Sequence, residues 1–231
     1  GQIGPTPSPA PATSLGYWSA RLGQYGVTTE SLQVLDEELL AFDDPDGLRI
    51  EIIGVADAGS RPGWADGPVP AEHAIRGLAH VTLAEQGYET TARLLGDVMR
   101  FRLLGESDNR FRFGLGAGGA GLRVDLLHMP DASPGHVAVG TVHHVAWRAA
   151  GDAEQLAWRE RLIGQGLDVT PVIDRQYFRS IYYREPGGVL FEIATDPPGF
   201  TVDEPLERLG TALQLPPRLE ARRAFLEAVL P

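Results

Sequence analysis

Hydrophobic and polar positions along the chain change their period several times, and these changes predict helices that alternate with strands. Three segments place apolar residues three and four positions apart, as amphipathic helices do: SLGYWSARLGQYGV (14–27), ETTARLLGDVMRFRLL (89–104) and EQLAWRERLIGQGLDV (154–169). Short apolar runs between them are typical of strands: LAHVTL (78–83), VHHVAW (142–147) and VLFEI (189–193). Single helices between groups of strands predict the α+β class.

The strands that end each group repeat. FDDPDGLRIEI (42–52) matches YREPGGVLFEI (183–193) position for position: an acid before Pro, a Gly two residues beyond it, and an apolar strand that carries a Glu. Glu51 therefore corresponds to Glu192. A predicted helix precedes each copy, with a Trp and a Leu at matching places, so the repeat includes a helix followed by strands.

A second, shorter repeat lies in the strands that precede two of the helices. LAHVTL matches VHHVAW and superimposes His80 on His144. Together the two repeats predict βαβββ modules, in which one strand and one helix are followed by three strands. Residues 76–130 and 138–198 form two complete modules, and we expect their mixed sheets to pair into one cup.

The predicted domains follow from these modules. Residues 1–56 form an incomplete N-terminal module, because the Pro- and Ser-rich start GQIGPTPSPAPATS is a poor first strand. A Gly- and Pro-rich linker at 57–75 leads to the paired C-terminal domain at 76–200, and a helical tail occupies 201–231. We expect the open front sheet to be completed by upstream chain or by another copy in a homo-oligomer.

Composition and charge exclude several classes of partner and site. The chain has 231 residues, a formal net charge of -11 and no run of Lys or Arg, so binding to a nucleic-acid backbone is not expected. No cysteine is present, which excludes disulfides, Cys-ligated zinc and iron–sulfur clusters and fits a cytoplasmic protein. No apolar stretch reaches the ~20 residues that span a membrane, so a membrane partner is not expected either.

Glu192 is the residue that points to chemistry. It lies in an apolar run, where a buried carboxylate needs an ion pair or a metal, whereas on the solvent face it would need neither. A single strand histidine is more often structural, but His80 and His144 occupy equivalent positions that paired modules would bring face to face. Two imidazoles and one carboxylate suit Fe(II) or Mn(II). We therefore predict a metal centre of His80, His144 and Glu192.

The segments GLAHVTL, TVHHVAW and IYYREPGGVLFEI resemble the vicinal oxygen chelate superfamily, and residues 175–200 resemble its ring-cleaving dioxygenases of the hydroquinone dioxygenase type. The resemblance implies oxygen-dependent cleavage of a hydroquinone- or catechol-type ring at the metal, with O2 and a small aromatic molecule as partners. Six residues meet the extradiol dioxygenase pattern: Ile181, Tyr182, Glu185, Pro186, Gly188 and Glu192. The pattern implies that Tyr182 hydrogen-bonds the substrate oxygen on the metal.

One part of the extradiol pattern is missing from this chain. Extradiol enzymes have a histidine upstream of the tyrosine, whereas Asp174 and Arg175 occupy that window here. The resemblance therefore implies that Asp174, Arg175 or Tyr177 handles the proton instead. Tyr177, Phe178 and Trp147 are candidate walls for an aromatic substrate, although strand aromatics are commonly core residues.

Two other functions remain open. A glyoxalase-like isomerase or lyase needs a fourth metal ligand, and Asp125 is a candidate because VDLL aligns with FEIA in the repeat. A non-catalytic small-molecule-binding protein of the antibiotic-resistance type would not require the two histidines. The presence of both histidines and the glutamate favours the dioxygenase.

Overall fold

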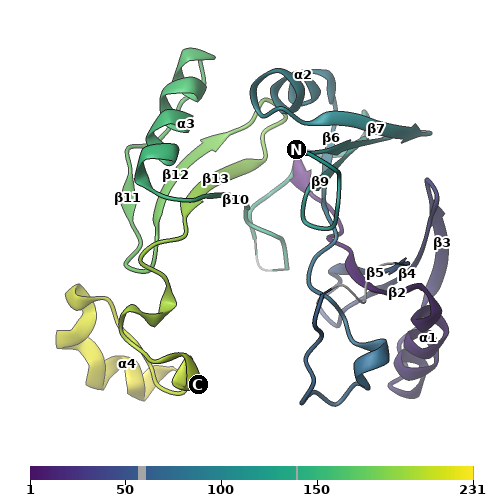
Figure 1. The fold of residues 1–231 in the computed structure, drawn as a ribbon, viewed down its shortest axis with the longest axis horizontal. Coiled ribbons are helices and arrows are strands. Elements are labelled where there is room, and N and C mark those ends of the chain that lie inside the picture. Colours follow the sequence, from purple (N-terminus) through teal and green to yellow (C-terminus); the bar gives the residue numbers. More distant parts are fainter. Residues whose placement is uncertain (57–60, 139, 231) are drawn as a thin grey trace. The chain divides into compact units, whose positions relative to one another are not determined.

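The structure is a computed structural model that describes residues 1–56, 61–138 and 140–230, and it divides into two compact units (Figure 1). The first unit comprises Gly1–Val145 with Arg184–Leu190, and the second comprises Ala146–Tyr183 with Phe191–Pro231. In the described part of the chain, no helix is both long enough and apolar enough to cross a membrane.

Three sheets share one strand order. The strands have these bounds: β1 (Gln2–Ile3), β2 (Ser8–Pro11), β3 (Glu30–Val34), β4 (Glu37–Asp43), β5 (Arg49–Val55), β6 (Val81–Glu85), β7 (Arg102–Ser107), β8 (Arg110–Gly114), β9 (Arg123–His128), β10 (Val145–Ala149), β11 (Ile173–Asp174), β12 (Arg179–Arg184) and β13 (Leu190–Thr195). The sheets run β2-β5-β4-β3, β1-β6-β9-β8-β7 and β10-β13-β12-β11. In each module the first strand therefore lies beside the fourth. This common order confirms the predicted α+β class built from βαβββ modules.

One helix joins the first and second strands of each module: α1 (Leu15–Gln24), α2 (Glu89–Arg93) and α3 (Asp152–Gly164). A π-helical turn, Leu94–Val98, follows α2, and β7 begins soon after it, so this helix is shorter than the predicted 89–104. Gly26 and Gly166 follow α1 and α3 with φ of 75° and 82°, in the left-handed conformation that favours glycine.

The expectation that the Pro-rich start cannot supply a strand was wrong. β2 pairs in parallel with β5 and is the first strand of the front module, so that module is complete. The prolines alternate along the segment, at Pro7, Pro9 and Pro11, and alternate residues of a strand direct their backbone groups to one side. On that side the carbonyls of Pro7 and Pro9 accept hydrogen bonds from Ala79 and Arg76 (2.8 Å each). The missing N–H groups therefore do not interrupt the pairing with β5.

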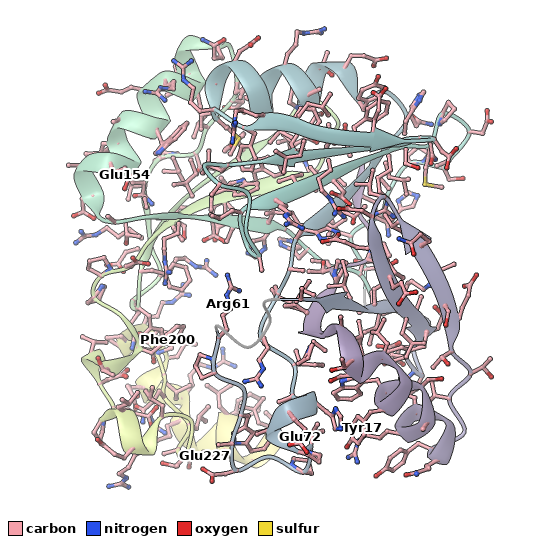
Figure 2. The ribbon with its side chains drawn as sticks, turned by 45° about the vertical axis from the view of Figure 1, so that its right-hand side comes forward. Tyr17, Arg61, Glu72, Glu154, Phe200 and Glu227 are labelled. Atoms are coloured by element: carbon pink, nitrogen blue, oxygen red, sulfur yellow. The ribbon has the colours of Figure 1, made fainter. Side chains whose placement is uncertain are left out.

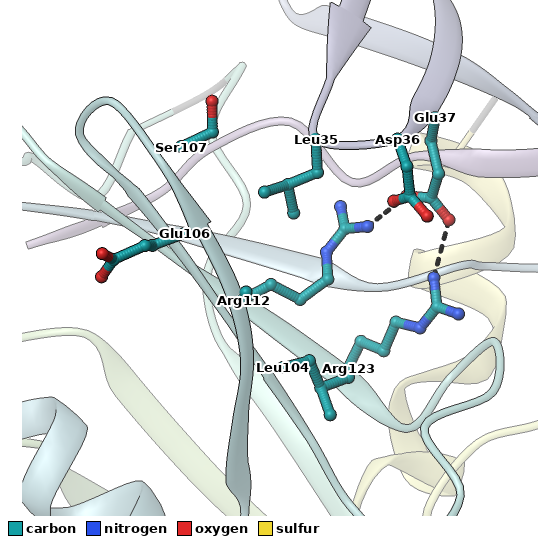
Figure 3. A pocket seen from close by; sticks show the side chains of 9 residues that line it. Leu35, Asp36, Glu37, Leu104, Glu106, Ser107, Arg112 and Arg123 are labelled. Carbon is teal, nitrogen blue, oxygen red and sulfur yellow. Dashed lines mark hydrogen bonds and ion pairs between the residues drawn. The ribbon is translucent and has the colours of Figure 1, made fainter.

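The front and middle modules pack together within the first unit. Glu37, at the start of β4, accepts hydrogen bonds from Arg112 and Arg123 of the middle module, beside a cavity of about 570 Å³ (Figure 3). One buried apolar cluster combines residues of both modules: Leu39, Ala41, Ile53 and Ala79. The middle module thus belongs to one compact unit with the front module, and the predicted domain at 76–200 stays a prediction.

The linker and the tail carry short helical turns. Residues 57–60 of the predicted linker lie outside the described residues, and its end forms a 3-10 turn, Ala71–His73, that packs on α1. Trp18 Nε1 donates to the His73 carbonyl (2.9 Å), and Tyr17 stacks on the His73 ring beside this turn (Figure 2). The tail contains 3-10 turns and one helix: Phe200–Val202, Leu206–Arg208, Pro217–Arg222 and α4 (Arg223–Val229).

The repeated acid before Pro closes the turn between the third and fourth strands. Asp44 Oδ1 accepts hydrogen bonds from the backbone N–H groups two and four residues further on (2.9 and 2.8 Å). Glu185 accepts the equivalent two bonds with its two oxygens (2.7 and 2.6 Å). The acid of this motif is thus explained by backbone N–H groups that need acceptors in a tight turn.

Glu185 lies beside a second buried carboxyl group, that of Glu85 at the end of β6. Glu85 is 1% exposed and neither of its oxygens is hydrogen-bonded, because the Thr91 hydroxyl donates to Glu185 (2.5 Å). Burial and the neighbouring Glu185 raise the pKa of Glu85 to about 8, from an ordinary value of 4.5. The folded protein therefore holds a proton on Glu85 that the unfolded chain releases near pH 4.5. Its contribution to stability is full below pH 4.5 and is lost as the pH rises to about 8.

Replacing Glu85 by Gln is expected to flatten this pH dependence, because the amide cannot lose a proton. For wild type, the free energy of unfolding should fall by up to about 1.4 kcal/mol per pH unit across that window. Urea unfolding at several pH values from 5 to 9 measures the slope. Glu89→Gln, an exposed glutamate at the start of α2, is the control and should keep the wild-type slope. A wild-type slope in Glu85→Gln would contradict the assignment.

Candidate active site

Glu192 lies in the middle of β13 and is 2% exposed. Its Oε1 accepts hydrogen bonds from the hydroxyl groups of Ser180 and Tyr182, the latter at 2.8 Å. Both donors lie on β12, two residues apart, and therefore on one face of the sheet. The alternative in which Glu192 faces solvent is excluded, since the carboxylate is buried and held by two donors.

Three other aromatic residues of this sheet contact one another on the opposite face. Phe191 makes edge contacts with Trp147 and Tyr183, with ring centroids 5.3 and 5.7 Å apart. Phe191 and Tyr183 are the sequence neighbours of Glu192 and Tyr182, and neighbouring strand residues point to opposite faces. Trp147 is half-buried and packs edge-on against Phe191, and its contact with a substrate stays a prediction.

The structure separates the two residues that were predicted to act with Tyr182. β11 pairs with β12 so that Asp174 lies opposite Arg179, on the face away from Ser180 and Tyr182. Strand register therefore directs Asp174 away from Tyr182, and its catalytic role stays a prediction. Arg175, one residue further on, is close enough to Tyr182 for its positive charge to lower the pKa of the hydroxyl, although burial acts more strongly and raises it.

Tyr177 and Phe178, the other predicted substrate contacts, have partners near the tail. The Tyr177 hydroxyl donates to Asp203 (2.9 Å), and its ring stacks on Phe200 with centroids 5.1 Å apart. Phe200 is labelled in Figure 2. The Phe178 carbonyl accepts a hydrogen bond from the Arg175 N–H (2.9 Å), which closes the loop between β11 and β12. Their contact with a substrate stays a prediction.

His144 directly precedes β10, as His80 directly precedes β6. The Nδ1 atoms of His144 and His143 lie 2.9 Å apart, with the rings perpendicular. Both residues come before the strand begins, so the alternation of side chains along a strand does not govern them.

His80 lies in a buried charged network of the first unit. It is 4% exposed, and its Nε2 lies 3.2 Å from Oδ2 of Asp125 on β9. Asp125 also accepts two hydrogen bonds from Arg112 (2.8 and 3.0 Å) and one from Arg110 (3.0 Å). Burial alone would raise the pKa of Asp125, but its contacts with His80 and Arg112 outweigh burial and hold the pKa well below its ordinary range.

The predicted metal centre draws on both units. His80 and His144 belong to the first unit and Glu192 to the second. Among the residues that the structure describes, no group of three or more His, Asp or Glu side chains is arranged to hold a metal ion. The three-residue centre therefore stays a prediction.

The repeated modules are those of a known group of proteins. The profile of the Glyoxalase/Bleomycin resistance protein/Dioxygenase superfamily matches residues 77–193. The chain belongs to this superfamily. Within the superfamily, a crystal structure from Bacillus subtilis subsp. subtilis str. 168, named as a dioxygenase, has a TM-score of 0.90 and 38% identity. The match covers 100% of this chain and 74% of that one.

Two relatives by sequence are named for ring cleavage. MhqO of Bacillus subtilis (strain 168), named as a ring-cleaving dioxygenase, is 39% identical over 98% of this chain and 72% of its own length. The chlorohydroquinone/hydroquinone 1,2-dioxygenase of Sphingobium indicum is 35% identical over 95% of this chain and 70% of its own length. The resemblance seen in the sequence is confirmed.

Ser180 is a site residue that sequence reasoning missed. Its hydroxyl is buried and donates to the same carboxylate oxygen as that of Tyr182. The available signal was its position two residues before Tyr182 in a strand, which puts both side chains on one face.

Proposed function

We propose that this protein is a metal-dependent dioxygenase that uses O2 to cleave a dihydroxylated aromatic ring of the hydroquinone or catechol type. The observation that carries the proposal is the buried Glu192 carboxylate, held by the hydroxyls of Tyr182 and Ser180 with Arg175 nearby. A carboxylate, a phenol and a guanidinium together suit a substrate that must lose phenolic protons. The names of the two relatives point to the same chemistry.

His144 and Glu192 are the residues of the last module that fit a divalent metal. In the middle module, the histidine directly before the first strand lies 3.2 Å from Asp125 on the fourth strand. His144 and Glu192 occupy the corresponding positions, so the same module fold should bring an imidazole and a carboxylate together. These are ligands of Fe(II), our first choice, and of Mn(II). Such a metal, when bound, lowers the pKa of a coordinated phenol and leaves positions open for two reactants.

The predicted third ligand, His80, fits this centre poorly. Its Nε2 faces Asp125, and that carboxylate already binds two guanidinium groups. A divalent cation placed there would be repelled by both positive charges. We therefore restrict the proposed ligands supplied by this chain to His144 and Glu192.

Tyr182 holds a proton at the site. Burial raises the pKa of its hydroxyl above the ordinary value of 10.0, and the bond to Glu192 also raises it. The hydroxyl therefore stays protonated at neutral pH and can donate a hydrogen bond to Glu192 or to a substrate oxygen. Ser180 fixes the orientation of the carboxylate, and Arg175 supplies positive charge that favours a phenolate.

Oxygen uptake tests the proposal. The full chain, loaded with Fe(II) or with Mn(II), should consume one O2 per hydroquinone or catechol and yield a ring-opened acid. The metal-free chain should consume none. Turnover of a glutathione thiohemiacetal without oxygen uptake would contradict the proposal and favour an isomerase. Binding of the aromatic without any turnover would favour a binding protein.

Replacing Tyr182 by Phe should leave the metal in place and slow ring cleavage by roughly 10- to 10⁴-fold, the range for a general acid-base group. The ring and its packing are kept, and Ser180 still holds Glu192. Metal content and the rate of oxygen uptake are the two measurements. Tyr183→Phe, on the core face of the same strand, is the matched control and should keep near wild-type turnover. Equal rates for wild type and Tyr182→Phe would refute the role.

A further inference from the structure

Every module carries an acid on its fourth strand, and the three acids meet different partners. All are at least 96% buried: Glu51, Asp125 and Glu192. The facing residue on the third strand is Ala41 in the front module and Arg112 in the middle module. In the last module, Tyr182 of the third strand donates to the acid. The place beside the acid is thus left open in the front module, occupied by a guanidinium in the middle module, and occupied by a phenol in the last module.

In the first unit, two of these acids surround one histidine. His80 Nε2 lies 3.2 Å from Asp125, and Glu51 is close enough to His80 and Arg110 for their charges to act on it. His80 corresponds in the repeat to His144, and Glu51 corresponds to Glu192. The first unit therefore places near His80 the residue types that were predicted to hold the metal, although these side chains are not arranged to hold an ion among the described residues.

Three buried atoms of this group have no hydrogen-bond partner: both ring nitrogens of His80 and Oε2 of Glu51. The Nε2 atom is the one that lies 3.2 Å from Asp125, and both residues are 4% exposed. Buried polar atoms are normally paired, so unpaired ones call for an explanation. An imidazole nitrogen and a carboxylate oxygen are both atoms that a divalent cation would satisfy.

Beside Asp125 and His80, the positive charge comes from arginine side chains and not from a metal ion. Arg112 binds both oxygens of Asp125 and reaches on to Glu37, while Arg110 adds a third bond to Asp125. Burial alone would lower the pKa of Arg112, but its bonds to Asp125 and Glu37 outweigh burial, so the guanidinium stays charged. A second cation beside it would be repelled.

We propose that Glu51, His80 and Asp125 are the counterpart of the catalytic metal site, in which the guanidinium of Arg112 takes the place of the cation. His80 is then not a ligand of the catalytic metal. Loss of the Arg112 guanidinium would free Oδ1 of Asp125, leave Arg110 as the one guanidinium on that carboxylate, and so open a site for one divalent cation. This inference rests on the repeat and on the geometry of the first unit, and not on ring cleavage.

Cobalt(II) binding tests the proposal by a readout other than activity. Arg112→Met keeps the bulk of the side chain and removes its charge, and the full-length variant should bind one more Co(II) per chain than wild type. The double variant Arg112→Met with His80→Ala should lose that extra ion. A folded Arg112→Met protein that binds no more Co(II) than wild type would overturn the proposal. The experiment compares the number of Co(II) ions bound by the variant and by wild type. Its outcome therefore does not depend on whether the protein is a dioxygenase.

A second measurement does not require Arg112 to be changed. His80→Ala should retain the wild-type content of catalytic metal, whereas His144→Ala should lose it. Loss of metal in a folded His80→Ala protein would overturn the proposal and restore His80 as a ligand. Retention in both variants would leave His80 outside the metal site and count against the proposed dioxygenase ligands instead.

Discussion

Replacing Glu192 by Gln should remove the metal from the protein and abolish ring cleavage. The amide keeps the size of the side chain and can still accept hydrogen bonds from Ser180 and Tyr182, so the fold should survive. It loses the negative charge that a divalent metal requires. The loss of metal affinity should exceed the roughly 10- to 100-fold cost of removing an outer-shell partner. Metal analysis of the purified protein and oxygen uptake measure the two effects.

The matched control for this change is Glu51→Gln. Glu51 is equally buried and occupies the same place in the front module, but it lies outside the proposed catalytic centre. Burial raises the pKa of Glu51, so neutralising this residue should not destabilise the fold. We expect wild-type metal content and turnover in Glu51→Gln. A Glu192→Gln protein that keeps its metal would remove the carboxylate from the proposed ligand set.

Replacing Asp125 by Asn should strongly destabilise the folded protein and leave the rate of ring cleavage largely unchanged. The substitution leaves Arg112 and Arg110 without their buried counter-charge and His80 without its acid. Removing one partner of a buried ion pair costs about 3–5 kcal/mol. For a chain of this size that lowers the melting temperature by roughly 10 °C. Thermal unfolding, with metal content measured well below the transition, checks both parts.

Asp97 is an exposed acid of the same module, and Asp97→Asn is the control. It should have the same melting temperature as wild type. Retention of metal and turnover in folded Asp125→Asn protein is the outcome expected of a dioxygenase. Loss of the metal from folded protein would make Asp125 a ligand. That result would favour the four-ligand isomerase over the dioxygenase.

The module organisation was readable from the sequence because its causes are local. An acid before Pro is repeated because the same turn needs the same acceptor at Asp44 and at Glu185. The buried acids Glu51 and Glu192 repeat because they occupy one register position in the fourth strand. Alternating prolines were also readable in principle, since a period of two puts all their missing donors on one side of β2.

The pairing of modules and the partners of the buried charges were decided only by the tertiary structure. Arg112 meets Glu37 across 75 positions of the chain, and His80 meets Asp125 across a sheet. No local period records such contacts, because they depend on how sheets pack. The sequence by itself therefore determined the repeated modules and the superfamily, and it led to the proposed roles of Glu192 and Tyr182. Tertiary packing decided that Trp147 packs against Phe191 and that His80 lies beside Asp125, which binds two arginines.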